Sequence, residues 1–109
     1  MIVSTSSTIA NHRVVKTLGL ATGSTIRARH IGKDILAALK NIVGGEIEEY
    51  SKMLGEAREQ ALDRMCAHAK TLGANAVIGT RFNSSYVMGS ASEILAYGTA
   101  VIVEPESSP

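Results

Sequence analysis

Cysteine, proline and aromatic residues are scarce in this chain, which has one cysteine, two prolines, one phenylalanine and no tryptophan. Because Cys66 stands alone, a disulfide framework within one chain is excluded. The few aromatic side chains and the formal net charge of +1 disfavour base stacking and electrostatic steering to nucleic acid or anionic lipid. No apolar run approaches the roughly 20 residues of a membrane span. We therefore expect neither nucleic acid nor membrane among the partners.

The composition is instead aliphatic, with 45% apolar residues in 109, which suits a single domain spanning residues 1–109. The last residues, 106–109, are expected to form a frayed tail. The N-terminus, from Ile2 to Thr5, lacks the basic and apolar regions of a signal peptide. Together with the lone Cys66, this favours a reducing compartment, and we expect a cytoplasmic protein.

The apolar pattern predicts strands, then two helices, then strands. A short helix is expected at Ile31–Val43, stopped by Gly44 and Gly45. The polar segment Ser84–Glu93 is expected to be a hairpin loop. The expected strands are Met1–Thr5, Arg13–Arg29 (bent or divided, with a bulge at Gly19 or Gly23), Asn75–Ser85 and Ile94–Glu104. This order predicts an α+β domain with a small, mostly antiparallel sheet, one short helix and one long helix.

The long helix, Ile47–Leu72, is the most informative segment, with Gly73 as its expected C-cap. At about 100° per residue, Arg58 and His68 fall on its apolar side. A buried arginine requires an anionic partner, so Arg58 is expected to face a carboxylate, a chain terminus, a neighbouring subunit or a ligand. The apolar side collects Ile47, Tyr50, Met53, Leu54, Ala57, Ala61, Met65, Ala69 and Leu72.

Two features of the pattern predict a homo-oligomer. A helix of about 26 residues is about 39 Å long and would overhang a compact domain whose radius of gyration is about 13 Å. Adjacent apolar residues in the last two strands, Val77–Ile78 and Val101–Val103, indicate strands covered on both faces. The helices would cover one face and a second subunit the other. The alternative is a monomer whose helix kinks at Gly55.

Several motifs resemble the YbjQ-like family across nearly the whole chain. They are the junction Ala69–Gly79 (AKTLGANAVIG), the segment Asp34–Gly45 ending in NIVGG, and Tyr50 with the triplet Glu56–Arg58. The resemblance implies a single domain that forms ring-shaped homo-oligomers, typically pentamers, of a small α+β subunit. It also implies a label as a heavy-metal-binding domain.

The candidate ligand or interface residues are Arg58, Tyr50 and His68. Arg58 and Tyr50, eight residues apart, could bind an anion between helix and sheet, or Arg58 could form a structural ion pair. His68 is either a hydrogen-bonded core residue or a catalyst. Cys66 and His68 are the metal candidates, but they lie about 200° apart around the helix and cannot hold one ion together within a subunit. A ring could still gather one ligand from each copy.

No catalytic constellation is identified, and three functions remain open. The first is a non-enzymatic homo-oligomeric module, a pentamer, that binds a small ligand, an ion or a partner at its subunit interfaces. The second is a heavy-metal-binding protein that uses Cys66 and the histidines, with a metal ion as its cofactor. The third is an enzyme whose interfacial site uses Arg58, Tyr50 and His68.

Overall fold

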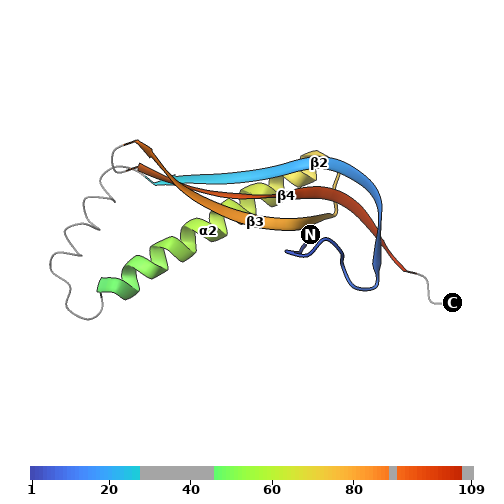
Figure 1. Ribbon diagram of the computed structural model, residues 1–109, viewed down its shortest axis with the longest axis horizontal. Coiled ribbons are helices and arrows are strands. Elements are labelled where there is room, and N and C mark those ends of the chain that lie inside the picture. Colours follow the sequence, from blue (N-terminus) through green and yellow to red (C-terminus); the bar gives the residue numbers. More distant parts are fainter. Residues whose placement is uncertain (28–45, 89–90, 107–109) are drawn as a thin grey trace.

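The computed structural model describes residues 1–27, 46–88 and 91–106. Along the chain these form β1 (Ile2–Val3), β2 (His12–Arg27), α2 (Glu46–Thr71), β3 (Ala76–Met88) and β4 (Ala91–Pro105). The strands make one sheet in the order β1-β3-β4-β2, and α2 lies across one of its faces (Figure 1). The expected helix at residues 31–43 lies outside the described residues. No described helix is long and apolar enough to cross a membrane.

The expected mostly antiparallel sheet is confirmed, and its one parallel pairing makes it mixed. β2 and β3 both pair antiparallel with the central strand β4, whereas β1 pairs parallel with the start of β3. The bounds of α2 agree with the predicted helix to one residue at each end. The helix is closed as predicted by Gly73, which has φ of +89°. The Gly73 N–H bonds the Lys70 carbonyl and the Ala74 N–H bonds the Ala69 carbonyl, which is the Schellman arrangement.

The predicted hairpin loop Ser84–Glu93 is wrong, because both strands continue into it. β3 runs to Met88 and β4 begins at Ala91, with Ser84 paired to Ile94. Serine and glycine suggested a loop by composition. Cross-strand pairing with apolar partners outweighs this weak local preference, as is usual for strands.

The segment predicted as one bent strand or two short ones is a single strand, β2. Its register with β4 shifts between Val14 and Lys16 and again between Thr17 and Gly19, and Gly19 has φ of +119°. The bulge expected at a glycine is therefore at Gly19. Gly23 has a different role, because a Cβ added there would overlap Met65 N and Ala61 O of α2. The missing side chain at Gly23 lets the backbones of strand and helix touch.

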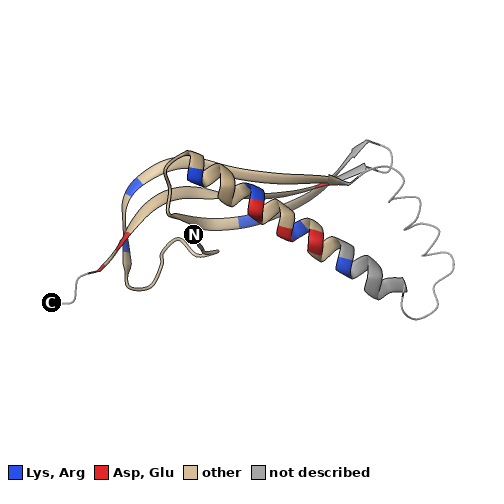
Figure 2. Ribbon diagram, turned by 180° about the vertical axis from the view of Figure 1, so that it is seen from behind, with Lys and Arg blue, Asp and Glu red and all other residues tan. Residues whose placement is uncertain are grey.

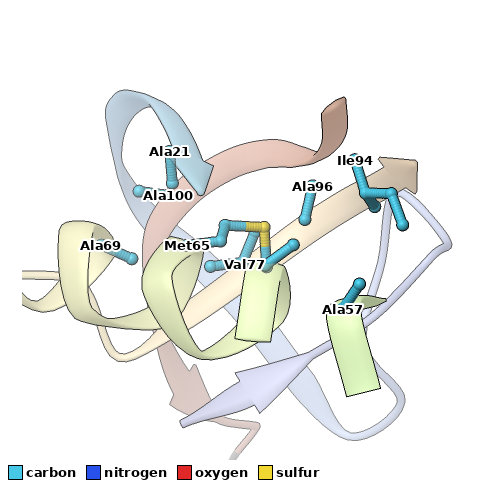
Figure 3. Close-up of a cluster of buried hydrophobic side chains, with 9 residues drawn as sticks. Ala21, Ala57, Met65, Ala69, Val77, Ile94, Ala96 and Ala100 are labelled. Carbon is cyan, nitrogen blue, oxygen red and sulfur yellow. The ribbon is translucent and has the colours of Figure 1, made fainter. Parts of the chain in front are cut away.

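A row of buried residues, mostly alanine, places α2 close to the sheet. Ala57, Ala61, Met65 and Ala69 follow one another at intervals of four and are fully buried. They pack against side chains from all three long strands, and Met65 lies at the centre of this cluster (Figure 3). The strand residues of the cluster are Ala21, Val77, Ile94, Ala96 and Ala100. The predicted apolar face of the helix is confirmed at these four positions.

The other face of the sheet is covered in part by the chain's own N-terminal segment. Ile9 packs there against Ala76, Val101 and Val103. The expectation that strands with adjacent apolar residues are covered on both faces is thus met within one chain at this end of the sheet. The molecule is a thin plate with extents of 62 × 27 × 16 Å and a radius of gyration of 17.6 Å, above the roughly 13 Å of a compact domain.

Candidate functional site

Two side chains one turn apart on α2 reach over the free edge of β2. His68 Nδ1 accepts the backbone N–H of Thr22 at 3.0 Å, and Arg64 Nη1 donates to the carbonyl of Ser24 at 2.6 Å. Gly23 lies between the two strand residues, where α2 touches the sheet. We call Arg64, His68, Thr22 and Ser24 the edge clasp. It satisfies backbone groups that an edge strand would otherwise offer to another chain.

The hydrogen bond from Thr22 determines which tautomer the neutral His68 ring adopts. Since a backbone N–H can only donate, Nδ1 must carry a lone pair, and the proton of the neutral ring is on Nε2. The imidazole is half-buried at the end of α2. His68 is thus hydrogen-bonded, as one of its two readings expects, but only half-buried, and its use as a ligand or interface residue stays a prediction.

The structure corrects the placement of Arg58, which is exposed and not buried on the apolar side of α2. The buried row at Ala57 and Ala61 faces the sheet squarely, so Arg58, one residue further, is turned about 100° toward water. In the described part of the chain no carboxylate pairs with it. Tyr50 lies in α2, but its side chain is outside the described set, so a shared anion site with Arg58 stays a prediction.

The metal candidates do not form a site within the described residues. No group of three His, Cys, Asp or Glu side chains there could hold an ion. Cys66 is half-buried and packs against the core cluster. His68 uses Nδ1 in the edge clasp. Of the other histidines, His12 lies at the start of β2 with Nδ1 2.8 Å from the Ala10 carbonyl oxygen, and His30 is outside the described residues.

A second surface was not found by sequence reasoning, namely the part of the sheet that neither α2 nor the N-terminal segment covers. Leu20 and Ile26 of β2 are 62% and 60% exposed there. The register places Leu95 and Tyr97 of β4 on the same face. We call Leu20, Ile26, Leu95 and Tyr97 the open face. Its signal in the sequence is the alternation from residue 20 to 26, where Ala21, Gly23 and Thr25 fall on the helix side and the two large apolar residues, Leu20 and Ile26, on the opposite side.

Charge is distributed unevenly over the described residues. Lysine, arginine, aspartate and glutamate follow the outer side of α2, whereas the strands carry few charges (Figure 2). The ion pair between strands joins Arg13 and Glu104 at 3.2 Å, far along the sheet from the open face. The outer side of α2 is polar, whereas the open face is mixed: its apolar side chains share that side of the sheet with Glu93, which pairs with Ile26, and Arg81, which pairs with Tyr97.

Comparison of the chain with known proteins identifies its family. A model of the YbjQ family, described as "Putative heavy-metal-binding", matches residues 1–104. The chain belongs to this family. A UPF0145 protein of Dehalococcoides mccartyi strain BAV1 is 62% identical over 104 residues, which cover 95% of this chain and 100% of the relative. A UPF0145 protein of Methanosarcina acetivorans is 58% identical over 101 residues, covering 93% of this chain and 95% of that protein.

A further relative and a solved structure extend the comparison. A UPF0145 protein of Pyrococcus abyssi is 55% identical over 106 residues, covering 97% of this chain and 93% of that protein. A crystal structure of a DUF74-family protein of unknown function from Pediococcus pentosaceus has a TM-score of 0.63 and 15% identity, covering 95% of this chain and 98% of that one. The latter likeness shows the fold alone. The family description names heavy-metal binding, but the described residues of one subunit do not supply a fitting set of ligands.

Proposed function

We propose that this YbjQ-family protein is a homo-oligomeric binding module, a closed ring of copies that holds a small ligand, an ion or a partner where subunits meet. The observation that carries the proposal is the open face, where two large aliphatic side chains, Leu20 and Ile26, are more than half exposed on one strand. Large aliphatic side chains exposed on one face of a sheet are typical of interaction sites. The occupant is a second copy of the chain.

The amount of exposed surface supports self-association. The chain exposes 7260 Å², whereas a compact monomer of its mass would expose about 5,800 Å². The surplus of about 1,500 Å² is close to what two interfaces of standard size remove from one subunit, at about 800 Å² each. A subunit in a closed ring has two neighbours and therefore two such interfaces. The pentamer implied by the family resemblance is one ring of this type.

The charge distribution supports the open face over the outer side of α2 as the contact. Charged side chains on the helix such as Glu59 and Asp63 are exposed, and removing them from water is costly. Apolar area on the open face gains about 25 cal/mol per Å² when it is buried. Neither a metal-binding nor an enzymatic role gains a specific observation from the residues that the structure describes.

Native mass spectrometry tests the proposal directly. The wild-type protein should give a closed oligomer at micromolar concentration, and the double variant Leu20→Lys/Ile26→Lys should give a folded single subunit, because buried lysines would oppose assembly. Leu54→Lys is the matched control, since Leu54 is exposed on α2 away from the open face and its replacement should leave the mass unchanged. A bound ligand would add mass to the oligomer and be lost from the double variant.

The result that overturns the proposal is a wild-type protein that is monomeric at micromolar concentration. If the double variant is still oligomeric, self-association stands, but the open face is not the contact between subunits. An oligomer that never carries or takes up a further molecule would contradict the binding role.

A further inference from the structure

The open face changes in character from one side of the sheet to the other. On β2 its large side chains are the aliphatic Leu20 and Ile26, both more than half exposed. On β3 the register places the exposed Arg81 on the same face, because Arg81 pairs with Tyr97 of β4. Two strand spacings of about 4.8 Å each separate the aliphatic side from the charged side, so chemically different partners can cover the two sides.

Backbone acceptors hold Arg81 in a defined orientation. Its Nη1 atom donates to the carbonyl oxygen of Thr5 at 2.8 Å and to that of Thr80 at 2.9 Å. The bond to Thr5 ties the N-terminal segment to β3, although the two residues are 76 positions apart. Both bonds to described residues use Nη1, so Nε and Nη2 can donate side by side to one oxyanion.

The charge of Arg81 is not balanced by an acid in the described part of the chain. The acid that the register places on this face is Glu93, which pairs with Ser85 of β3. Ser85 lies four residues along the strand from Arg81, which is about 13 Å at about 3.3 Å per residue. Because a covered arginine without an anion is strongly destabilising, any partner that covers this side of the open face must bring an anion to Arg81.

The groups around Arg81 on this face are polar side chains and an aromatic ring. The half-buried Tyr97 is its direct cross-strand neighbour, and Thr22 is the next residue across the sheet. The exposed Asn83 is the next residue of β3 on the same face. Hydroxyl and amide groups can donate to an oxyanion, and the ring provides a flat apolar surface. This combination fits an anionic group attached to a planar apolar body.

We propose that Arg81 and Tyr97 bind a small organic oxyanion, a carboxylate or a phosphate monoester attached to a planar apolar group. Arg81 binds the oxyanion through Nε and Nη2, and Tyr97 contacts the planar group. Asn83 adds a donor to the oxyanion. This inference rests on the ligand-binding role proposed above and names its ligand class. The ligand lies on the β3 side of the open face, beside the aliphatic contact at Leu20 and Ile26.

Calorimetric titration at fixed ionic strength tests the site with phenyl phosphate, benzoate and inorganic phosphate as probes. An aromatic anion should bind the wild-type protein, and Arg81→Gln should weaken its binding at least about tenfold, because charge-assisted hydrogen bonds are lost. Arg58→Gln is the matched control, since this exposed arginine of α2 carries the same charge, and it should bind like the wild type. Preference for phenyl phosphate assigns a phosphate group to the ligand, and preference for benzoate assigns a carboxylate.

Tyr97→Leu tests the second half of the site. It should weaken binding of the preferred aromatic anion several-fold and leave that of inorganic phosphate unchanged, because only the contact with the planar group is removed. Thermal melting shows whether the variants fold. NMR of the wild-type protein provides a measurement that needs no variant, since the Arg81 Nε–H signal should shift as the aromatic anion saturates its site.

The outcomes separate this inference from the proposed function. A wild-type protein that assembles but binds none of the probes at up to about 10 mM overturns the oxyanion site and leaves self-association standing. Binding that Arg81→Gln and Arg58→Gln weaken equally, or that leaves the Arg81 signal in place, also overturns it. A monomeric wild-type protein that binds the aromatic anion through Arg81 overturns the ring and leaves the site.

Discussion

His68 and Thr22 are 46 positions apart in the chain, yet the Nδ1 atom of His68 accepts the Thr22 N–H at 3.0 Å. The contact joins the last turns of α2 to the edge of the sheet. Together with the bond from Arg64 to Ser24 it converts an edge strand into a protected one. The helix thereby influences which side of the sheet can accept another chain.

Replacing His68 with alanine removes the acceptor for the Thr22 N–H. The expected cost is about 1 kcal/mol of unfolding free energy, together with faster exchange of the Thr22 amide. Urea denaturation and amide exchange measure the two effects. Lys70→Ala, an exposed change in the same turn, is the control and should alter neither. An unchanged Thr22 exchange rate in His68→Ala would contradict the bond.

Two glycines should respond in opposite directions to alanine. Gly23→Ala forces a methyl group into the backbone of α2 at Met65 and Ala61, with an expected loss of about 1–3 kcal/mol. Gly55→Ala meets nothing nearer than Arg58 Nη2 at 3.9 Å and should stabilise the helix by about 0.5–1 kcal/mol. Chemical denaturation compares them. Similar stabilities for both variants would mean that strand and helix do not touch at Gly23.

Two buried threonines form a matched pair. Thr80 and Thr25 are each 3% exposed, but Thr25 Oγ1 donates to Ala57 O at 3.2 Å, whereas Thr80 Oγ1 has no partner among the described residues. Thr25→Val should cost about 1 kcal/mol, and Thr80→Val should be neutral or stabilise by about 1 kcal/mol. Thermal and urea unfolding provide the values. The reverse order would show that the Thr80 hydroxyl has a partner.

The exposed position of Arg58 predicts a small effect of its removal on folding. Arg58→Met should change the unfolding free energy by less than about 0.5 kcal/mol, as is usual for surface substitutions. Urea denaturation of the monomeric Leu20→Lys/Ile26→Lys background isolates folding from assembly. A loss of several kcal/mol of unfolding free energy in this background would mean that Arg58 is buried and paired, as the helical pattern suggested.

Cys66 provides a test of metal binding. Because Cys66 and His68 diverge on the helix and His68 Nδ1 is engaged, Cys66→Ser should leave the affinity of the wild-type protein for Zn²⁺ unchanged in calorimetric titration. Met65→Leu, a buried neighbour that keeps its volume, controls for altered packing. Stoichiometric Zn²⁺ binding that disappears only in Cys66→Ser would assign the thiol as a ligand.

Much of the secondary structure could be predicted from the sequence, because its signals are local. The row of apolar residues at helical spacing placed α2 to within one residue at each end, and Gly73 marked its end. The loop at Ser84–Glu93 was wrong because strand pairing depends on the partner strand and not on local composition. Arg58 was misplaced since a helical projection gives the order of residues around the axis but not the width of the buried stripe.

The candidate site depended still more on tertiary structure. Gly23 was interpreted as a possible bulge, yet its role is to let α2 approach, and no local signal distinguishes the two. The sequence by itself determines an α+β subunit with a long amphipathic helix. Apolar residues recur at the spacing of a helix in one segment and at the spacing of a strand in others, and both patterns are local. Only the tertiary structure decides that Arg64 and His68 bond the backbone of β2 while Leu20 and Ile26 of the same strand are more than half exposed. Strand order and helix placement bring together residues distant in sequence, and a surface is exposed or covered only as a result of that arrangement.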